Sequence, residues 1–183
     1  CCSPYGRKTA HRGPDSWGEW VGEHAVFAHS RLAVIDVENG LQPMKRTVEG
    51  HEFVITYNGE LYNTNDIRND LKSHGYEFTT ASDTEVLLYA YIQLRRKMCR
   101  NAERHILRLL SGILLRQRIF ACRDRFGVKP FFYTQKNDVT VFASELKSLF
   151  EYPDVSAVLD KTGLCELFAL SPARTQVSVC SKM

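Results

Sequence analysis

The sequence predicts an α+β fold. Strand-like runs rich in β-branched and aromatic residues come first, helical runs follow them, and strands and then helices return in the second half. This order of strands, helices, strands and helices is typical of a layered α+β domain. With 183 residues, 44% of them hydrophobic, the chain is long enough for one domain with a buried core.

Five segments predict strands, because they are apolar and rich in β-branched or aromatic residues. They are residues 24–36, 51–63, 118–124, 130–134 and 139–144. The second of them contains Asn58-Gly59, a pair that favours a turn because both residues tolerate positive φ.

Four segments predict helices, and they are residues 65–76, 82–94, 144–150 and 161–170. In the first, Ile67 and Leu71 are four residues apart and Gly75 follows, as in an amphipathic helix with its stop signal. The second opens on Ser82 with Glu85 three residues later. This spacing is a capping box, and it places Asp83 in the first turn of the helix.

The basic residues are concentrated in one segment. Residues 95–118 hold eight of the 24 Lys and Arg residues but one of the 21 Asp and Glu residues. The net charge of this segment is therefore +7, and the rest of the chain carries −4 within the overall +3. Such a segment could bind nucleic acid. Its leucine and isoleucine residues, however, would nearly surround a helix and leave no clean basic face, which argues against that use.

The remaining composition excludes several classes of protein. The six cysteines, at positions 1, 2, 99, 122, 165 and 180, form no CxxC pair and have no regular spacing with histidines. We therefore expect neither a metal site nor a disulfide framework. No apolar run approaches the roughly 18 residues of a membrane span, and no charged-then-apolar leader precedes the first motif. We expect a soluble, cytoplasmic protein.

Three features could carry chemistry. Asn58-Gly59 is either a tight turn or an oxyanion hole, in which an amide side chain and a backbone N–H stabilise a tetrahedral intermediate. Arg31 lies in an otherwise apolar strand, where an unpaired guanidinium is costly, so we expect it to meet a carboxylate of the protein or of a ligand. Asp83 could simply complement the N-terminus of its helix.

Six motifs resemble the glutaminase domain of glutamine-hydrolysing asparagine synthetases. They are "HRGPDSWG" (11–18), "SRLAVIDVENGLQPM" (30–44), "YNGELYN" (57–63), "SDTEVLL" (82–88), "RDRFGVKPFFY" (123–133) and "FASELKSL" (142–149). Their order matches the family, and the resemblance spans residues 9–94 and 117–175. The related sugar-phosphate aminotransferases are a poorer match to the first two motifs.

The resemblance implies a class II glutamine amidotransferase with an N-terminal-nucleophile hydrolase fold, in which two antiparallel sheets are sandwiched between helical layers. In this family an N-terminal cysteine attacks the side-chain amide of glutamine. The α-amine of the same cysteine is the base, and its pKa of about 7.7 to 8.0 suits that task. By this resemblance Cys1 is the nucleophile, and Asn58 and Gly59 form the oxyanion hole.

The same resemblance assigns the other contacts of glutamine. Arg31 would hold its α-carboxylate, and Asp83 and Glu60 would hold its ammonium group. The glutaminase half needs no cofactor. The released ammonia would reach a synthetase domain that activates aspartate with ATP and Mg, and the Ser-Gly-Gly loop of that domain is absent from this sequence. The resemblance also implies a homodimer.

Three places depart from the family pattern. Only ten residues precede "HRGPD", residues 95–116 stand where the family has a strand pair reading "LNG" and "AIWD", and the chain ends in "QVSVCSKM". Codons chosen for these stretches and read in a shifted frame restore "LNG", "AIWD" and "GVSVFKD". We therefore interpret residues 1–8, 95–116 and 176–183 as out-of-frame translation within an incomplete amidotransferase domain of residues 1–175.

Two alternatives stay open. In the first, the chain is an inactive fragment of this family without a working nucleophile, and the basic segment leaves buried strand ladders unpaired. In the second, it is a nucleic-acid-binding module built on that segment. The residues named above leave open whether the chain is an active enzyme.

Overall fold

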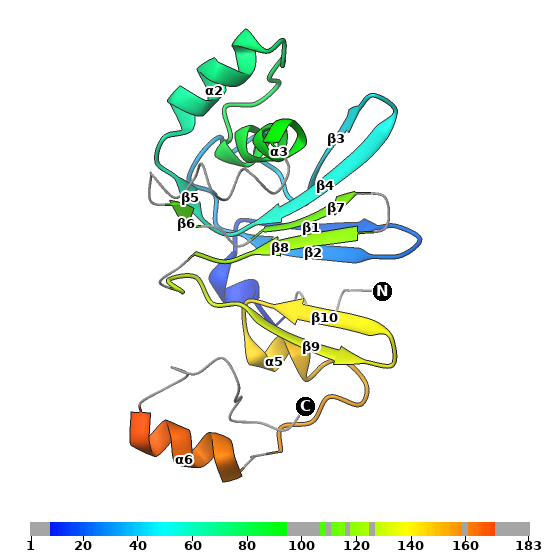
Figure 1. Ribbon diagram of the computed structural model, residues 1–183, viewed down its shortest axis with the longest axis vertical. Helices are drawn as coiled ribbons and strands as arrows, with labels where there is room; N and C mark the ends of the chain where they lie inside the picture. The colour runs from blue at the N-terminus through cyan, green and yellow to red at the C-terminus, as the bar shows by residue number, and fades with distance from the viewer. Residues whose placement is uncertain are drawn as a thin grey trace. The chain divides into compact units, whose positions relative to one another are not determined.

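The computed structural model describes residues 8–94, 107–108, 111–115, 118–124, 127–158 and 161–170, and between 107 and 115 it describes the backbone alone. The chain divides into two compact units, Cys1–Phe131 and Phe132–Met183. The first unit contains the sheet and helices around which the candidate site is built (Figure 1).

A four-stranded antiparallel sheet lies at the centre of the first unit. Its strands, in spatial order, are β3 (Met44–Val48), β4 (His51–Tyr57), β7 (Ser111–Leu115) and β8 (Arg118–Cys122). Met44 pairs with Ile55 across β3 and β4, and Ile55 pairs with Ile113 across β4 and β7. The turn between β3 and β4 uses Glu49 and Gly50, both at positive φ.

Helix α3 (Asp83–Leu94) packs on one face of this sheet, and α2 (Thr64–Ser73) packs against α3 (Figure 1). Alternate residues of β4, namely Phe53, Ile55 and Tyr57, belong to the same buried cluster as the side chains of α3. Every residue of α3 from Asp83 to Ile92 is buried, which agrees with a helix that is hydrophobic on all sides.

The other face of the sheet is covered by the hairpin of β1 (Ser16–Val21) and β2 (Val26–Arg31) (Figure 1). The β4 residues that alternate with Phe53, Ile55 and Tyr57 point to this hairpin, and Thr56 is one of them. His29 of β2 is hydrogen-bonded through Nδ1 to the hydroxyl of Thr56, with the two atoms 2.9 Å apart. The first unit therefore has three layers, which are the helices, the sheet and the hairpin.

Short elements complete this unit. The 3₁₀ turn η1 (Ala10–Arg12) precedes β1, and β5 (Glu60–Leu61) pairs with β6 (Leu107–Arg108). The second unit contains the hairpin of β9 (Phe132–Lys136) and β10 (Val139–Ala143), followed by α5 (Leu146–Leu149) and α6 (Lys161–Leu170). Asn137 and Asp138 form the turn of its hairpin, both at positive φ.

Most predicted elements are confirmed, with differences at specific places. The strand predicted over residues 24–36 ends at Arg31, and residues 32–43 are a loop. Strands β1 and β3 were not predicted, because Gly18 and Glu19 interrupt the apolar residues of β1, and because β3 has apolar residues only at its two ends. Helix α3 begins where expected and Ser82 Oγ accepts from the Thr84 N–H, but Glu85 does not bond Ser82, because Thr79 and Thr80 take its carboxylate instead.

The expectation for the basic segment was wrong in one respect. Residues 111–115 form a strand, and that strand is paired on both sides, with β4 and with β8. The ladder of β4 is therefore not left unpaired. Residues 95–106, 109–110 and 116–117 of the segment lie outside the described residues, as do residues 1–7 and 171–183.

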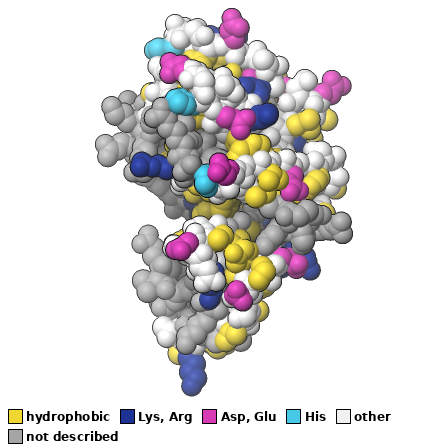
Figure 2. All heavy atoms as spheres, turned by 90° about the vertical axis from the view of Figure 1, so that its right-hand side faces the viewer, with side chains coloured by type: hydrophobic (Ala, Val, Ile, Leu, Met, Phe, Trp, Pro, Cys, Tyr) yellow, Lys and Arg dark blue, Asp and Glu magenta, His cyan; other side chains and the backbone are white. Residues whose placement is uncertain are grey.

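Apolar side chains also reach the surface, and Figure 2 shows several on one face of the molecule. The loop after β2 is rich in them, because Leu32, Val34, Val37 and Leu41 are all more than half exposed. Within the described part of the chain, no helix combines the length and the apolar character that crossing a bilayer requires.

Candidate functional site

The end of β4 is the first part of the candidate site. Asn58 and Gly59 are half-buried and connect β4 to β5. These two strands are not partners, because β4 pairs with β3 and β7 whereas β5 pairs with β6. Asn58-Gly59 therefore does not form the tight turn of a hairpin, which was the simpler interpretation of this pair.

Gln42 holds the residue before this pair. Its side-chain carbonyl accepts a hydrogen bond from the Tyr57 N–H at 2.6 Å, and its amide nitrogen donates to the Tyr57 carbonyl at 3.0 Å. The same nitrogen donates to the hydroxyl of Thr84 at 3.3 Å. The sequence does not mark Gln42 as a site residue, because no local pattern shows which backbone groups a glutamine in a loop will bind.

Arg31 ends β2 and is buried, with 6% of its surface exposed. Its Nη1 donates to the carbonyl of Val37, and its Nη2 donates to the carbonyls of Ile35 and Asp36, at distances of 2.8 to 3.0 Å. Among the described residues, the hydrogen-bond partners of this guanidinium are therefore backbone carbonyls of the following loop and not a carboxylate of the protein. These carbonyls accept three hydrogen bonds from a guanidinium that has five N–H groups. The other alternative, a carboxylate of a ligand, stays a prediction.

Asp36 connects that loop to the N-terminus of α3. One carboxylate oxygen accepts from the backbone N–H of Ala81 at 2.7 Å, and the other accepts from the backbone and side chain of Asn39. The hydrogen bond from Ala81 is the main cause that lowers the pKa of Asp36, and the bonds from Asn39 add to it. Hydrogen bonds thus connect the loop held by Arg31 to a residue two positions before Asp83.

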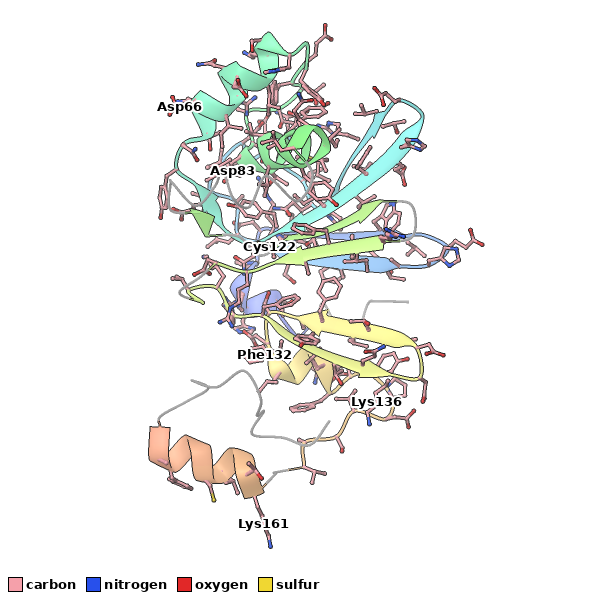
Figure 3. All side chains as sticks on the ribbon, viewed as in Figure 1. Asp66, Asp83, Cys122, Phe132, Lys136 and Lys161 are labelled. Carbon is pink, nitrogen blue, oxygen red and sulfur yellow. The ribbon has the colours of Figure 1, made fainter. Side chains whose placement is uncertain are left out.

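Asp83 is the first residue of α3 (Figure 3). Only 6% of its surface is exposed. Its carboxylate accepts a hydrogen bond from the backbone N–H of Leu61 at 3.2 Å, which joins the helix to β5. Burial raises the pKa of Asp83, and the negative charge of Glu60 raises it further. The carboxylates of Asp83 and Glu60 therefore repel each other beside the Asn58-Gly59 segment. A bound cation would relieve this repulsion.

The hydroxyl of Tyr57 is buried close to these charges. The residue is 3% exposed, and among the described residues its hydroxyl has no hydrogen-bond partner. Burial is the main cause that raises the pKa of Tyr57, and the charges of Asp83 and Glu60 contribute. An unpaired buried hydroxyl is costly, so this one is a group that a bound polar ligand could satisfy.

The structure brings most of the expected site residues to one region of the first unit. Asn58, Gly59 and Glu60 follow one another between β4 and β5, and Leu61 connects them to Asp83. Arg31 is linked to the same region through the loop and Asp36. Cys1 lies outside the described residues, and no group of three or more possible metal ligands occurs among the residues that the structure describes.

Comparison with known proteins gives a consistent set of matches. A family model described as "Glutamine amidotransferase domain" matches residues 2–183. The chain is 46% identical over 164 residues to "Asparagine synthetase [glutamine-hydrolyzing] 3" of Bacillus subtilis strain 168, which covers 90% of this chain and 26% of that protein. It is 36% identical over 149 residues to the "Probable asparagine synthetase [glutamine-hydrolyzing]" of Schizosaccharomyces pombe, with coverages of 78% and 26%.

A solved structure shares the fold. "Glutamine phosphoribosylpyrophosphate (PRPP) amidotransferase from B. subtilis complexed with ADP and GMP" matches with a TM-score of 0.62 and 21% identity, over 81% of this chain and 40% of that chain. The α+β fold with antiparallel sheets is therefore shared with an amidotransferase of known structure. The chain spans about a quarter of the length of the curated relatives it matches.

Proposed function

Since this chain belongs to the glutamine amidotransferase domain family, we propose that it binds glutamine and hydrolyses its side-chain amide as the glutaminase part of a glutamine-hydrolysing asparagine synthetase. The observation that carries the proposal is the joining of Asp83 to the segment after Asn58-Gly59 through the Leu61 N–H. A cation-binding carboxylate and a pair of oxyanion donors are two of the features that a glutamine site requires.

Each end of glutamine has a partner in this proposal. The ammonium group binds between Asp83 and Glu60, whose mutual repulsion a cation relieves. The α-carboxylate binds Arg31, whose guanidinium is held in place by the loop carbonyls. The side-chain carbonyl faces the Asn58 amide and the Gly59 N–H, which stabilise negative charge on that oxygen.

If residues 1–8 are translated in frame, contrary to the frame-shift interpretation above, the proposed nucleophile is Cys1, whose α-amine takes the thiol proton. The thiolate attacks the carbonyl carbon of the glutamine side-chain amide and forms a tetrahedral intermediate. The C–N bond of that intermediate then breaks, and the leaving nitrogen takes the proton held by the α-amine and departs as ammonia. Water then hydrolyses the thioester to glutamate and restores the thiol. These steps balance without an oxidant, a metal or a cofactor.

The proposal extends to the rest of the protein. The ammonia serves a synthetase domain that amidates aspartate, and ATP and Mg act in that domain. The fold is completed as two antiparallel sheets between helical layers. A cytoplasmic location and a homodimer complete the proposal, and neither nucleic acid nor a membrane is a partner.

Release of ammonia and glutamate from L-glutamine by the chain, expressed with a free α-amine on Cys1, tests this function. We expect Cys1→Ala to lower hydrolysis by about three orders of magnitude or more while glutamine still binds. Cys165→Ala, which removes an exposed thiol from α6, is the matched control and leaves the rate unchanged. Failure of the chain to bind L-glutamine, or unchanged hydrolysis after Cys1→Ala, contradicts the proposal.

A further inference from the structure

The side chain of Gln42 bonds the backbone of Tyr57, where the backbone of a neighbouring strand would normally bond. Strands β3 and β4 are antiparallel, with Met44 opposite Ile55. Continuing that register by two residues places position 42 opposite Tyr57, but β3 begins at Met44. The edge of β4 at Tyr57 is therefore beyond the end of its neighbouring strand.

The side chain of Gln42 makes the two bonds that a ladder partner would make there. It accepts from the Tyr57 N–H at 2.6 Å and donates to the Tyr57 carbonyl at 3.0 Å. A side-chain amide has the same donor and acceptor as a peptide group, so this one can replace a peptide group in an antiparallel pair. Gln42 thus extends the hydrogen-bonded ladder of β4 to Tyr57, the residue before Asn58.

The bond to the Tyr57 carbonyl acts directly on Asn58. That carbonyl and the N–H of Asn58 belong to one peptide group, which is planar and rigid. A hydrogen bond that fixes the carbonyl oxygen therefore also fixes the direction of the Asn58 N–H and the start of the Asn58-Gly59 segment. A tilt of this peptide would move both proposed oxyanion donors.

Gln42 is itself held from two other directions. Its amide nitrogen also bonds the hydroxyl of Thr84, the residue after Asp83, at 3.3 Å. On the hairpin side, Gly18 lies so close to the backbone carbonyl oxygen of Gln42 that a Cβ at position 18 would collide with it. The glutamine is therefore fixed between β1, the end of β4 and the start of α3.

We propose that Gln42 is a positioning residue for glutamine recognition, one that aligns Asn58-Gly59 with the side-chain carbonyl of the substrate. This inference rests on the proposed function. It assigns to Gln42 a role in recognising the side-chain amide, which differs from a general contribution to stability because a purely structural residue would affect every ligand equally.

Two ligands separate these roles, L-glutamine and L-norvaline, which keeps the α-amino and α-carboxylate groups but lacks the side-chain amide. Their dissociation constants are measured for the full chain and for Gln42→Met, which fills similar space without the hydrogen bonds. Gln135→Met, on an exposed position of β9, is the matched control. We expect Gln42→Met to weaken L-glutamine binding about tenfold or more, the effect of one or two lost hydrogen bonds, and to change L-norvaline binding by about twofold at most.

A second variant covers the case in which Gln42→Met does not fold. Gln42→Glu keeps the acceptor for the Tyr57 N–H but, when ionised, cannot donate to the Tyr57 carbonyl, so the same selective loss for L-glutamine is expected. Equal losses for both ligands, or binding equal to that of Gln135→Met, overturn the inference while the proposed function stands. Absence of L-glutamine binding by the unmodified chain instead overturns the proposed function, and this inference with it.

Discussion

At the scale of single residues, the site depends on how buried charges are compensated. Arg31 donates to three backbone carbonyls, which hold the guanidinium in place without neutralising its charge. Asp83 accepts a backbone N–H and lies near a second carboxylate, so burial and repulsion raise its pKa. A buried cationic group and a buried acidic group are complementary to an α-amino acid, which carries one charge of each sign.

Asp83→Asn tests the negative half of this arrangement. The variant can still accept the Leu61 N–H, so we expect the fold to persist and glutamine binding to weaken about tenfold or more, because the charge that attracts the ammonium is lost. Asp66→Asn, in the exposed first turn of α2 (Figure 3), is the control and should bind glutamine normally. Titration of both variants with L-glutamine measures the effect.

The pH dependence follows from the direction of the Asp83 shift. Its pKa lies above the ordinary value of 3.8, so protonation begins at a higher pH than for an exposed aspartate. Glutamine affinity of the unmodified chain should therefore fall as the pH is lowered through that raised pKa. Asp83→Asn lacks this titration, and an identical acid dependence in that variant would rule out Asp83 as the group responsible.

At the scale of elements, α3 is anchored by a buried carboxylate near its start. Glu85 is fully buried and accepts hydrogen bonds from the backbone and hydroxyl groups of Thr79 and Thr80. Arg46 of β3 forms an ion pair with it at 2.8 Å. Burial acts to raise the pKa of Glu85, but these hydrogen bonds outweigh it and hold the pKa below its ordinary value. The helix, the loop before it and the sheet edge are thus joined at one side chain.

Removing this anchor should be costly. We expect Glu85→Ala to lower the free energy of unfolding by about 3 kcal/mol, because it leaves buried donors and the Arg46 charge without their acceptor. Glu52→Ala is the matched control, since Glu52 forms an exposed pair with Lys45 at 3.7 Å and should contribute about 1 kcal/mol or less. Urea denaturation of the two variants measures the difference, and equal losses would contradict this assignment.

The contact between the hairpin and the sheet predicts a second pH effect. Burial, and then the charge of Arg31, lowers the pKa of His29 to about 4 from 6.5. Between these values the unfolded chain binds a proton that the folded chain does not, so stability falls as the pH drops from 6.5 to 4. The full loss is about 3 kcal/mol by the linkage of 1.36 kcal/mol per pKa unit.

His29→Gln provides the comparison, because glutamine can still bond the hydroxyl of Thr56 but does not titrate. The difference in unfolding free energy between this variant and the unmodified chain should change by the stated amount between pH 7 and pH 4. Both proteins retain Asp83, whose raised pKa has the opposite effect on stability, so the difference isolates His29. Parallel pH profiles for the two proteins would show that His29 titrates normally.

At the scale of the whole molecule, the strand at residues 111–115 is a central part of the sheet. It lies between β4 and β8, where it completes the ladder that begins at β3. The interpretation of residues 95–116 as out-of-frame translation stays a hypothesis, and it now includes a strand of the sheet. We expect the encoding DNA, read in a shifted frame, to give "LNG" and "AIWD" there. DNA that encodes no such motifs in any frame would end that hypothesis.

The sequence by itself determined the elements with a clear local period and the residues with distinctive chemistry. The β-branched and aromatic residues of β4 predicted a strand, and the spacing of Ser82 and Glu85 predicted the start of α3. The motifs also indicated Arg31, Asn58, Gly59, Glu60 and Asp83 as a group. Strands β1 and β3 were missed, because both are short, Gly18 and Glu19 break the apolar run of β1, and the three central residues of β3 are polar.

Only the tertiary structure decided which partner each polar group takes. Gln42 bonds a residue 15 positions away, and Asp36 bonds one 45 positions away. Glu85 takes Thr79, Thr80 and Arg46 where the local pattern indicated Ser82. A local sequence pattern indicates which residues of a helix or strand are buried. The path of the whole chain brings donors and acceptors together that are distant in the sequence. That path therefore decides which groups complete the site, and the pairing of Gln42 with Tyr57 could not be read from the residue order.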